Sequence, residues 1–172
     1  MTKRMMKDAL LELLGQKELV NISVTAICEV ADVHRSTFYK YYSDPADLLR
    51  DVEQDYLDHI PTPSRDIESW DEEQIIDKTT AFFKYVRQNE EAFRVLLGDS
   101  TSSDFAARLI EMLCSKYVGT NKDDGDTTLY YTYLYIACGT VGMLREWVNS
   151  DFPLSSREIA EMMYFFSVKI AR

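Results

Sequence analysis

Apolar residues recur every three or four positions along most of the chain, which is the period of an amphipathic helix rather than the alternation of a strand. In the segment 3–14, for example, Met6, Leu10 and Leu13 fall on one side of a helix. Gly and Pro residues separate most of the segments that carry this period. The pattern therefore predicts an all-α protein.

The predicted helices follow one another with short connections. We expect them over residues 3–14, over a short stretch capped by Ser23, over 35–42, 45–60, 75–93 with a break near Asn89, 105–117, 127–149 and, at the end, from Ile159 to Ile170. Turn-rich or polar stretches at 64–70, 98–103, 119–126 and 150–153 predict loops. The segment 127–149 is apolar on nearly all sides, which is typical of a helix buried on several faces or at a subunit interface.

The segment 23–42 predicts two short helices joined by a tight turn at Asp32 and Val33, the geometry that places a second helix in the DNA major groove. Val33 and Phe38 would anchor the turn. The exposed residues of the second helix and its start carry donors for phosphates and base edges, namely His34, Arg35, Ser36, Thr37, Tyr39, Lys40 and Tyr41. The spacing alone also fits an ordinary solvated helix start with Ser36 as its cap.

Charge is distributed unevenly along the chain. The net charge is −10, yet residues 1–50 contain seven basic and seven acidic side chains. All the net negative charge therefore falls on residues 51–172, as expected for a nucleic-acid-binding head on an acidic body or for chance variation along an acidic chain.

Other chemistry has little support in the sequence. The odd number of cysteines, Cys28, Cys114 and Cys138, lie in apolar segments and suit reduced thiols. Neither His34 nor His59 has metal-ligand spacing, and no nucleophile elbow or phosphate loop occurs, so we expect no enzyme activity, catalytic residue, metal or cofactor. The chain has no run of 18 apolar residues and no signal peptide at its start, so we expect a soluble, cytoplasmic protein without a membrane partner.

The segment from about residue 3 to 57 resembles the N-terminal domain of the TetR/AcrR family of transcriptional regulators. The resemblance is carried by a basic first helix and by Ile22-Ser23-Val24-Thr25, Ile27, Ala31, Val33, Arg35-Ser36-Thr37-Phe38-Tyr39, Tyr42 and Asp47-Leu48-Leu49. It implies a DNA-binding domain over residues 1–46 and a helical regulatory and dimerisation domain over 47–172. It also implies a homodimer on double-stranded DNA, with Ser23, Thr25, Tyr39 and Lys40 on the backbone and Arg35 and Ser36 nearest the bases.

Two positions depart from the family pattern. Asp32 stands where the turn commonly has Gly, although Asp tolerates a left-handed backbone. Pro45 stands where the family commonly has a Lys that assists phosphate binding. The second departure predicts weak DNA binding with a shallow dependence on salt.

The C-terminal half offers two further expectations. Phe82, Phe83, Tyr133 and Trp147 either line a ligand cavity or simply form the core. Residues 139–149 and the last helix resemble a subclass of the family whose final two helices pair across a two-fold axis. That resemblance places Gly139, Gly142, Met162, Met163 and Phe166 in a dimer interface, where the glycines permit close backbone approach.

The sequence favours a homodimeric repressor that binds a palindromic operator and is released by a small-molecule effector or a regulatory protein. The alternative is a coregulator of the same fold that binds another protein and has weak or no DNA binding. A small-molecule sensor without regulatory output rests on analogy of fold alone.

Overall fold

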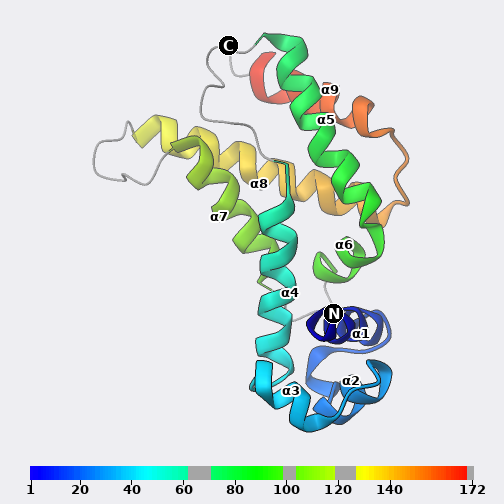
Figure 1. Ribbon diagram of the computed structural model, residues 1–172. Coiled ribbons are helices and arrows are strands. Elements are labelled where there is room, and N and C mark those ends of the chain that lie inside the picture. Colours follow the sequence, from blue (N-terminus) through cyan, green and yellow to red (C-terminus); the bar gives the residue numbers. More distant parts are fainter. Residues whose placement is uncertain (62–70, 99–103, 119–126, 170–172) are drawn as a thin grey trace. The chain divides into compact units, whose positions relative to one another are not determined.

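The computed structural model describes residues 1–61, 71–98, 104–118 and 127–169, and its regular elements there are helices (Figure 1). The all-α prediction is confirmed. The chain separates into two compact units, one of Met1–His59 with Val95–Phe105 and the other of Ile60–Arg94 with Ala106–Arg172. Each unit is described below by itself.

Residues 1–59 of the first unit form four α-helices and one 3-10 turn. They are α1 (Thr2–Leu14), η1 (Leu19–Asn21), α2 (Val24–Val30), α3 (Arg35–Tyr41) and α4 (Pro45–His59). α1 packs against α2 and α4, and α2 packs against α3. Fully buried Met6, Leu10, Ile27, Phe38 and Leu48 form the centre of this core. Apolar residues that recur every three or four positions lie on one side of a helix, and it is this side that is buried in each of these helices.

Local side-chain chemistry sets the helix starts in this unit. The Ser23 hydroxyl caps α2 by accepting a hydrogen bond from the backbone N–H of Ala26 at 3.1 Å, as predicted. α4 begins at Pro45, whose fixed φ suits a first helical residue. The predicted functional boundary after residue 46 falls in the first turn of α4, which lies with α1 in one compact unit. The division of function there remains a prediction.

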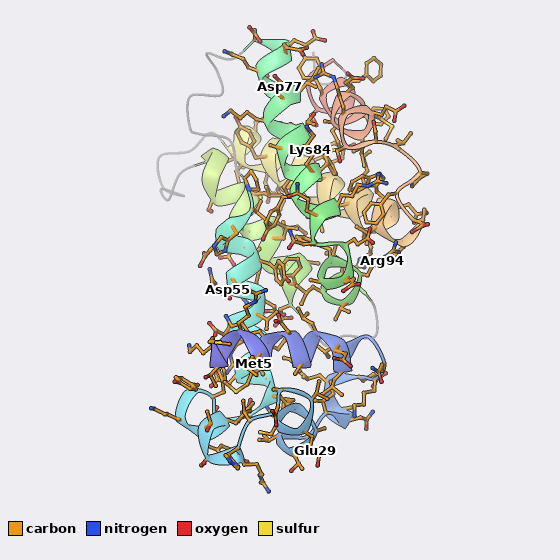
Figure 2. All side chains as sticks on the ribbon, turned by 45° about the vertical axis from the view of Figure 1, so that its right-hand side comes forward. Met5, Glu29, Asp55, Asp77, Lys84 and Arg94 are labelled. Carbon is orange, nitrogen blue, oxygen red and sulfur yellow. The ribbon has the colours of Figure 1, made fainter. Side chains whose placement is uncertain are left out.

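The second unit contains α5 (Glu72–Gln88), α8 (Thr127–Asn149), α9 (Ser156–Tyr164) and most of α7 (Phe105–Val118). α6 (Glu90–Leu96) spans the division between the units at residues 94 and 95. α5 and α9 pack side by side (Figure 1). Arg157 of α9 donates hydrogen bonds to Glu73 at 2.6 Å and to Asp77 at 3.1 Å, and Figure 2 labels Asp77 on α5.

Most of the predicted helix boundaries in this unit hold. α5 ends at Gln88 and α6 begins at Glu90, so the predicted break near Asn89 is confirmed. Capping boxes formed by Asp71 with Gln74 and by Ser155 with Glu158 start α5 and α9.

The last helix differs from the prediction. Regular α-helix ends at Tyr164, and Phe165–Lys169 form a π-helical turn, a wider turn that periodicity of 3.6 residues does not reveal. Ile170 lies outside the described residues. So do the loops expected at 64–70, at 119–126 and, apart from Gly98, at 98–103. Among the described residues, no helix is long and apolar enough to span a bilayer.

Candidate nucleic-acid interface

The connection between α2 and α3 is a tight turn, as predicted. Its central residue, Asp32, has φ of 51°, in the left-handed region that Gly usually occupies. The turn is closed by the backbone N–H of Val33, which donates to the carbonyl oxygen of Cys28 at 3.0 Å. Asp is one of the few residues with a Cβ that adopts this conformation readily, so the turn survives without Gly.

Aromatic packing fixes the orientation of α3. Phe38 is fully buried, and Tyr42, the residue that ends the helix, is 4% exposed. Their ring centroids lie 5.8 Å apart. Burial of this side of α3 leaves its opposite side and its first turn exposed to solvent.

The residues predicted to contact DNA lie on the exposed surface of this helix pair. Eight of the nine are exposed, and Thr37 is half-buried. They are Ser23, Thr25, His34, Arg35, Ser36, Thr37, Tyr39, Lys40 and Tyr41. The surface therefore brings together hydroxyl, imidazole, guanidinium and ammonium donors, which are the groups that bind phosphates and base edges. Their contact with DNA remains a prediction.

A hollow of about 340 Å³ lies at the α2–α3 turn, and both Arg35 and Cys28 line it. Burial raises the pKa of the Cys28 thiol and outweighs the opposing effect of the Arg35 charge. The thiol is therefore neutral at physiological pH, and Arg35 is the positive group of this hollow. Glu29 and Asp32 place negative charge at the same edge.

A second group of cations lies at the other end of α3. The Nζ atoms of Lys3, from α1, and Lys40 each lie 5.8 Å from the centre of the Tyr41 ring. This arrangement is a cation–π cluster with two ammonium groups around one exposed phenol. Sequence reasoning placed Lys40 and Tyr41 at the interface but did not single out Lys3, because the contact joins residues 38 positions apart.

The start of α4 carries carboxylates in place of a phosphate-binding Lys. Asp47 Oδ2 accepts hydrogen bonds from the backbone N–H of Ser43 at 3.0 Å and from its hydroxyl at 3.2 Å. Asp44 Oδ1 accepts from the backbone N–H of Asp47 at 2.8 Å. The backbone hydrogen bond from Ser43 is the main cause that lowers the pKa of Asp47. The backbone N–H groups of Ser43 and Asp47, which could otherwise donate to a phosphate here, are therefore occupied by the chain's own carboxylates.

Three of the four residues predicted to line a ligand cavity form part of a packed aromatic cluster. Phe82, Phe83 and Trp147 are at most 6% exposed, and Tyr133 is half-buried. Phe83 and Trp147 make an edge-to-face contact at 5.2 Å, and the Trp147 indole N–H donates to the carbonyl oxygen of Leu154 at 2.9 Å. These contacts place Phe82, Phe83 and Trp147 in a core. A ligand role for all four residues remains a prediction.

The residues predicted for a dimer interface divide into two groups. Gly139 and Gly142 are exposed on α8, and a Cβ added at either would meet nothing within 4 Å. Phe166 is 46% exposed. Met163 is 7% exposed and packs within its own chain, and Met162 is half-buried. Exposed surface is therefore contributed by the glycines and Phe166.

The described part of the chain holds no cluster of three or more His, Cys, Asp or Glu side chains able to bind a metal ion. What it does hold, in its first unit, is a helix–turn–helix with an exposed, donor-rich second helix. These features define a protein of the helix-turn-helix transcriptional regulator class.

Comparison with known proteins gives the family. The TetR family model described as "Transcriptional regulator C-terminal region" matches residues 73–167. The chain belongs to the TetR family of transcriptional regulators.

Individual proteins are similar to the chain in sequence or in fold. The chain is 24% identical over 168 residues to an HTH-type transcriptional regulator, YxbF, of Bacillus subtilis strain 168; the match covers 92% of this chain but only 42% of that protein. Among solved structures, the dihydroxyacetone kinase operon activator DhaS has a TM-score of 0.68 at 15% identity, covering 99% of this chain and 96% of DhaS. A TetR-family regulator from Syntrophomonas wolfei has a TM-score of 0.67 at 20% identity, covering 99% of this chain and 94% of that protein.

Proposed function

We propose that the chain is a homodimeric repressor that binds a palindromic operator through α3 and is released by an effector acting on its C-terminal half. The observation that carries the proposal is the exposed, donor-rich side of α3, which is held in place by fully buried Phe38 behind it. A surface of this kind, on the second helix of a helix–turn–helix, fits the major groove.

Within this surface the first turn of α3 is proposed to read sequence. Arg35 and Ser36 lie at the N-terminal end of the helix, the end that approaches base edges in helix-turn-helix proteins. A guanidinium spans the two acceptors of guanine in a fixed planar geometry, whereas the Tyr39 hydroxyl and the flexible Lys40 ammonium group suit phosphate oxygens. Arg35 is thus the proposed source of specificity.

Dimerisation is proposed to use the exposed side of α8. Tyr131 and Tyr135 are 62% and 80% exposed, and they precede Gly139 and Gly142 at helical spacing on the same side. A second copy of the chain is the proposed occupant, since glycines facing open space allow two helices to approach closely. Two α3 helices set roughly 34–36 Å apart would then dock on one face of the duplex.

Release is proposed to follow from binding of a small-molecule effector in the second unit, near Phe82, Phe83, Tyr133 and Trp147. An effector shifts the equilibrium only if it binds one spacing of the two α3 helices better than the other. Because the aromatic contacts of Phe83 and Trp147 would have to open to admit a ligand, effector binding should change the fluorescence of Trp147.

The test begins with selection of duplexes from a random 30-bp library by the full chain, followed by anisotropy titration of the selected duplex. Arg35→Ala should lose about 1–3 kcal/mol of binding and relax the preference at one base pair of each half-site. Lys17→Ala, an exposed cation after α1, is the control for loss of one positive charge. If Arg35→Ala kept the same base preference at every position of the duplex, Arg35 would not be a source of sequence specificity.

The direction of regulation needs its own measurement. Occupation of an operator by a dimer excludes other proteins from that DNA, which is why repression is proposed. DhaS, a structural neighbour, is named as an operon activator. A reporter placed behind the selected duplex should be expressed more when the gene of this chain is deleted, and lower expression would reverse the assignment.

The second candidate is a coregulator that binds another protein rather than DNA. The carboxylates of Asp44 and Asp47 at the start of α4 favour it, because they stand where a phosphate would otherwise be bound. Titrations at two salt concentrations discriminate between the candidates. Selective, salt-sensitive binding excludes the coregulator, and absence of any selected duplex supports it.

A further inference from the structure

A polar network joins α1, the end of α3 and α4. At its centre Asp51, on α4, accepts a hydrogen bond from the Tyr42 hydroxyl at 2.6 Å. The same carboxylate oxygen lies 2.9 Å from Lys7 Nζ and 3.6 Å from Lys3 Nζ. One carboxylate therefore holds a phenol and two ammonium groups that come from two other helices.

Lys7 strengthens the connection between α1 and α4. Its side chain is only 13% exposed, and its ammonium group also donates to the backbone carbonyl of Asp51 at 3.2 Å and to the carboxylate of Asp55. Figure 2 labels Asp55 on α4 beside α1. Charge-assisted hydrogen bonds with limited exposure hold their geometry better than isolated surface ion pairs do.

The network lies directly behind the cationic cluster at the end of α3. Lys3 Nζ is 5.2 Å from the centre of the Tyr42 ring and 5.8 Å from that of the Tyr41 ring. Tyr42 is buried and Tyr41, its neighbour, is exposed toward solvent. The position of the exposed phenol and of Lys3 therefore depends on the group that anchors Tyr42.

Protonation states suit this arrangement. Burial disfavours the charged form of Asp51, but hydrogen bonds from Tyr42 and Lys7 and the charges of Lys7 and Lys3 outweigh it and lower the pKa of the carboxyl. Burial, the hydrogen bond to Asp51 and nearby carboxylates raise the pKa of the Tyr42 hydroxyl. At neutral pH the acceptor is charged and the donor keeps its proton.

We propose that Asp51 is a positioning residue for DNA binding, which fixes the end of α3 and the start of α1 so that Tyr41, Lys3 and Lys40 converge on one backbone phosphate. The inference rests on the proposed DNA binding and adds a residue that does not itself touch DNA. Asp51 is 34% exposed and negatively charged, so by simple electrostatics it should oppose binding. The positioning role predicts instead that Asp51 strengthens DNA binding.

The experiment compares three substitutions in the full chain. Asp51→Asn removes the charge and weakens every contact of the network. Asp58→Asn, on the same helix and exposed, removes one negative charge outside the network and is the matched control. Tyr42→Phe removes only the hydrogen bond between α3 and α4, changes no charge, and keeps the ring that fills the core.

The readouts are affinity for the library-selected 30-bp duplex and the slope of log K against log salt. Asp51→Asn and Tyr42→Phe should each weaken binding by on the order of tenfold and should make the salt slope shallower by about one unit. Asp58→Asn should bind as tightly as the unmodified chain or more tightly. The double variant should lose little more than Asp51→Asn alone, because both changes break the same contact.

Circular dichroism before each titration verifies that helix content is unchanged, so a loss of affinity reports position rather than unfolding. Asp51→Asn that binds as tightly as Asp58→Asn, with an equal salt slope, would overturn the positioning role and leave the proposed function standing. Tyr42→Phe with unchanged affinity would overturn it equally. If the unmodified chain selects no duplex, the proposed function is overturned and the positioning role with it.

Discussion

Replacement of Asp32 by Gly tests whether the α2–α3 turn stores backbone strain. Asp32 has φ of 51°. A left-handed residue with a Cβ costs roughly 1–2 kcal/mol, and Asp pays less than most because its short polar side chain can hydrogen-bond locally. Gly removes that cost but loses about 0.5–1 kcal/mol through the greater freedom of the unfolded chain.

These two terms fix the order of stability of the variants. Asp32→Gly should be as stable as the unmodified chain or up to about 1 kcal/mol more stable. Asp32→Ala keeps a Cβ without the polar group, so it should be less stable than Asp32→Gly by about 0.5–1 kcal/mol. The hydrogen bond of the Val33 amide closes the turn. Protection of this amide from hydrogen exchange should therefore follow the same order among the variants.

Urea denaturation of the full chain measures the global effect, and hydrogen exchange of the Val33 amide measures the local one. Because the chain has two compact units, only the exchange measurement assigns the change to the turn. Equal exchange rates in Asp32→Ala and Asp32→Gly would refute the strain argument, since the two differ only by the Cβ.

Three further changes probe other contacts. Ser23→Ala removes the cap of α2 and should cost about 1 kcal/mol of unfolding free energy, whereas Ser23→Asp should restore it; equal stability of all three chains would discount the cap. Phe83→Ala should cost about 3–5 kcal/mol in urea, and a loss below about 1 kcal/mol would mean that the site collapses or is not core. The pKa of Asp51 is lowered on folding, so its contribution is complete above the unfolded value near pH 4 and is lost as pH falls through the lower folded value. Asp51→Asn should therefore lower stability at pH 7 and much less at pH 2, and an equal loss at both would contradict this.

The order of helices and much of the candidate interface could be predicted because the signals are local. Ser23 and Pro45 mark helix starts by their own chemistry, and the period of apolar residues shows which side of α3 is buried. Exposure of Arg35 and Lys40 follows once Phe38 is placed in the core.

What could not be predicted depends on contacts between distant residues or on the backbone. The bond between Tyr42 and Asp51, and the approach of Lys3 to Tyr41, require α1, α3 and α4 to be packed first. Phe152 was expected only as a loop residue. Phe152 is buried and has φ of 56°, and its ring centroid lies 4.7 Å from that of Trp147. No local sequence pattern predicts an aromatic residue in that conformation.

The carboxylates at the start of α4 affect how strongly DNA binding by the proposed dimer would depend on both copies being bound. In the proposed homodimer, the N–H groups of Ser43 and Asp47 donate to the chain's own carboxylates instead of to phosphate, so we expect a single copy to have little affinity for DNA of its own. Occupancy of the operator then depends on effective concentration. Once one copy is bound, its partner has an effective concentration on the order of millimolar at the second half-site. DNA binding by such a protein rises steeply with the concentration of the chain and disappears when the dimer separates.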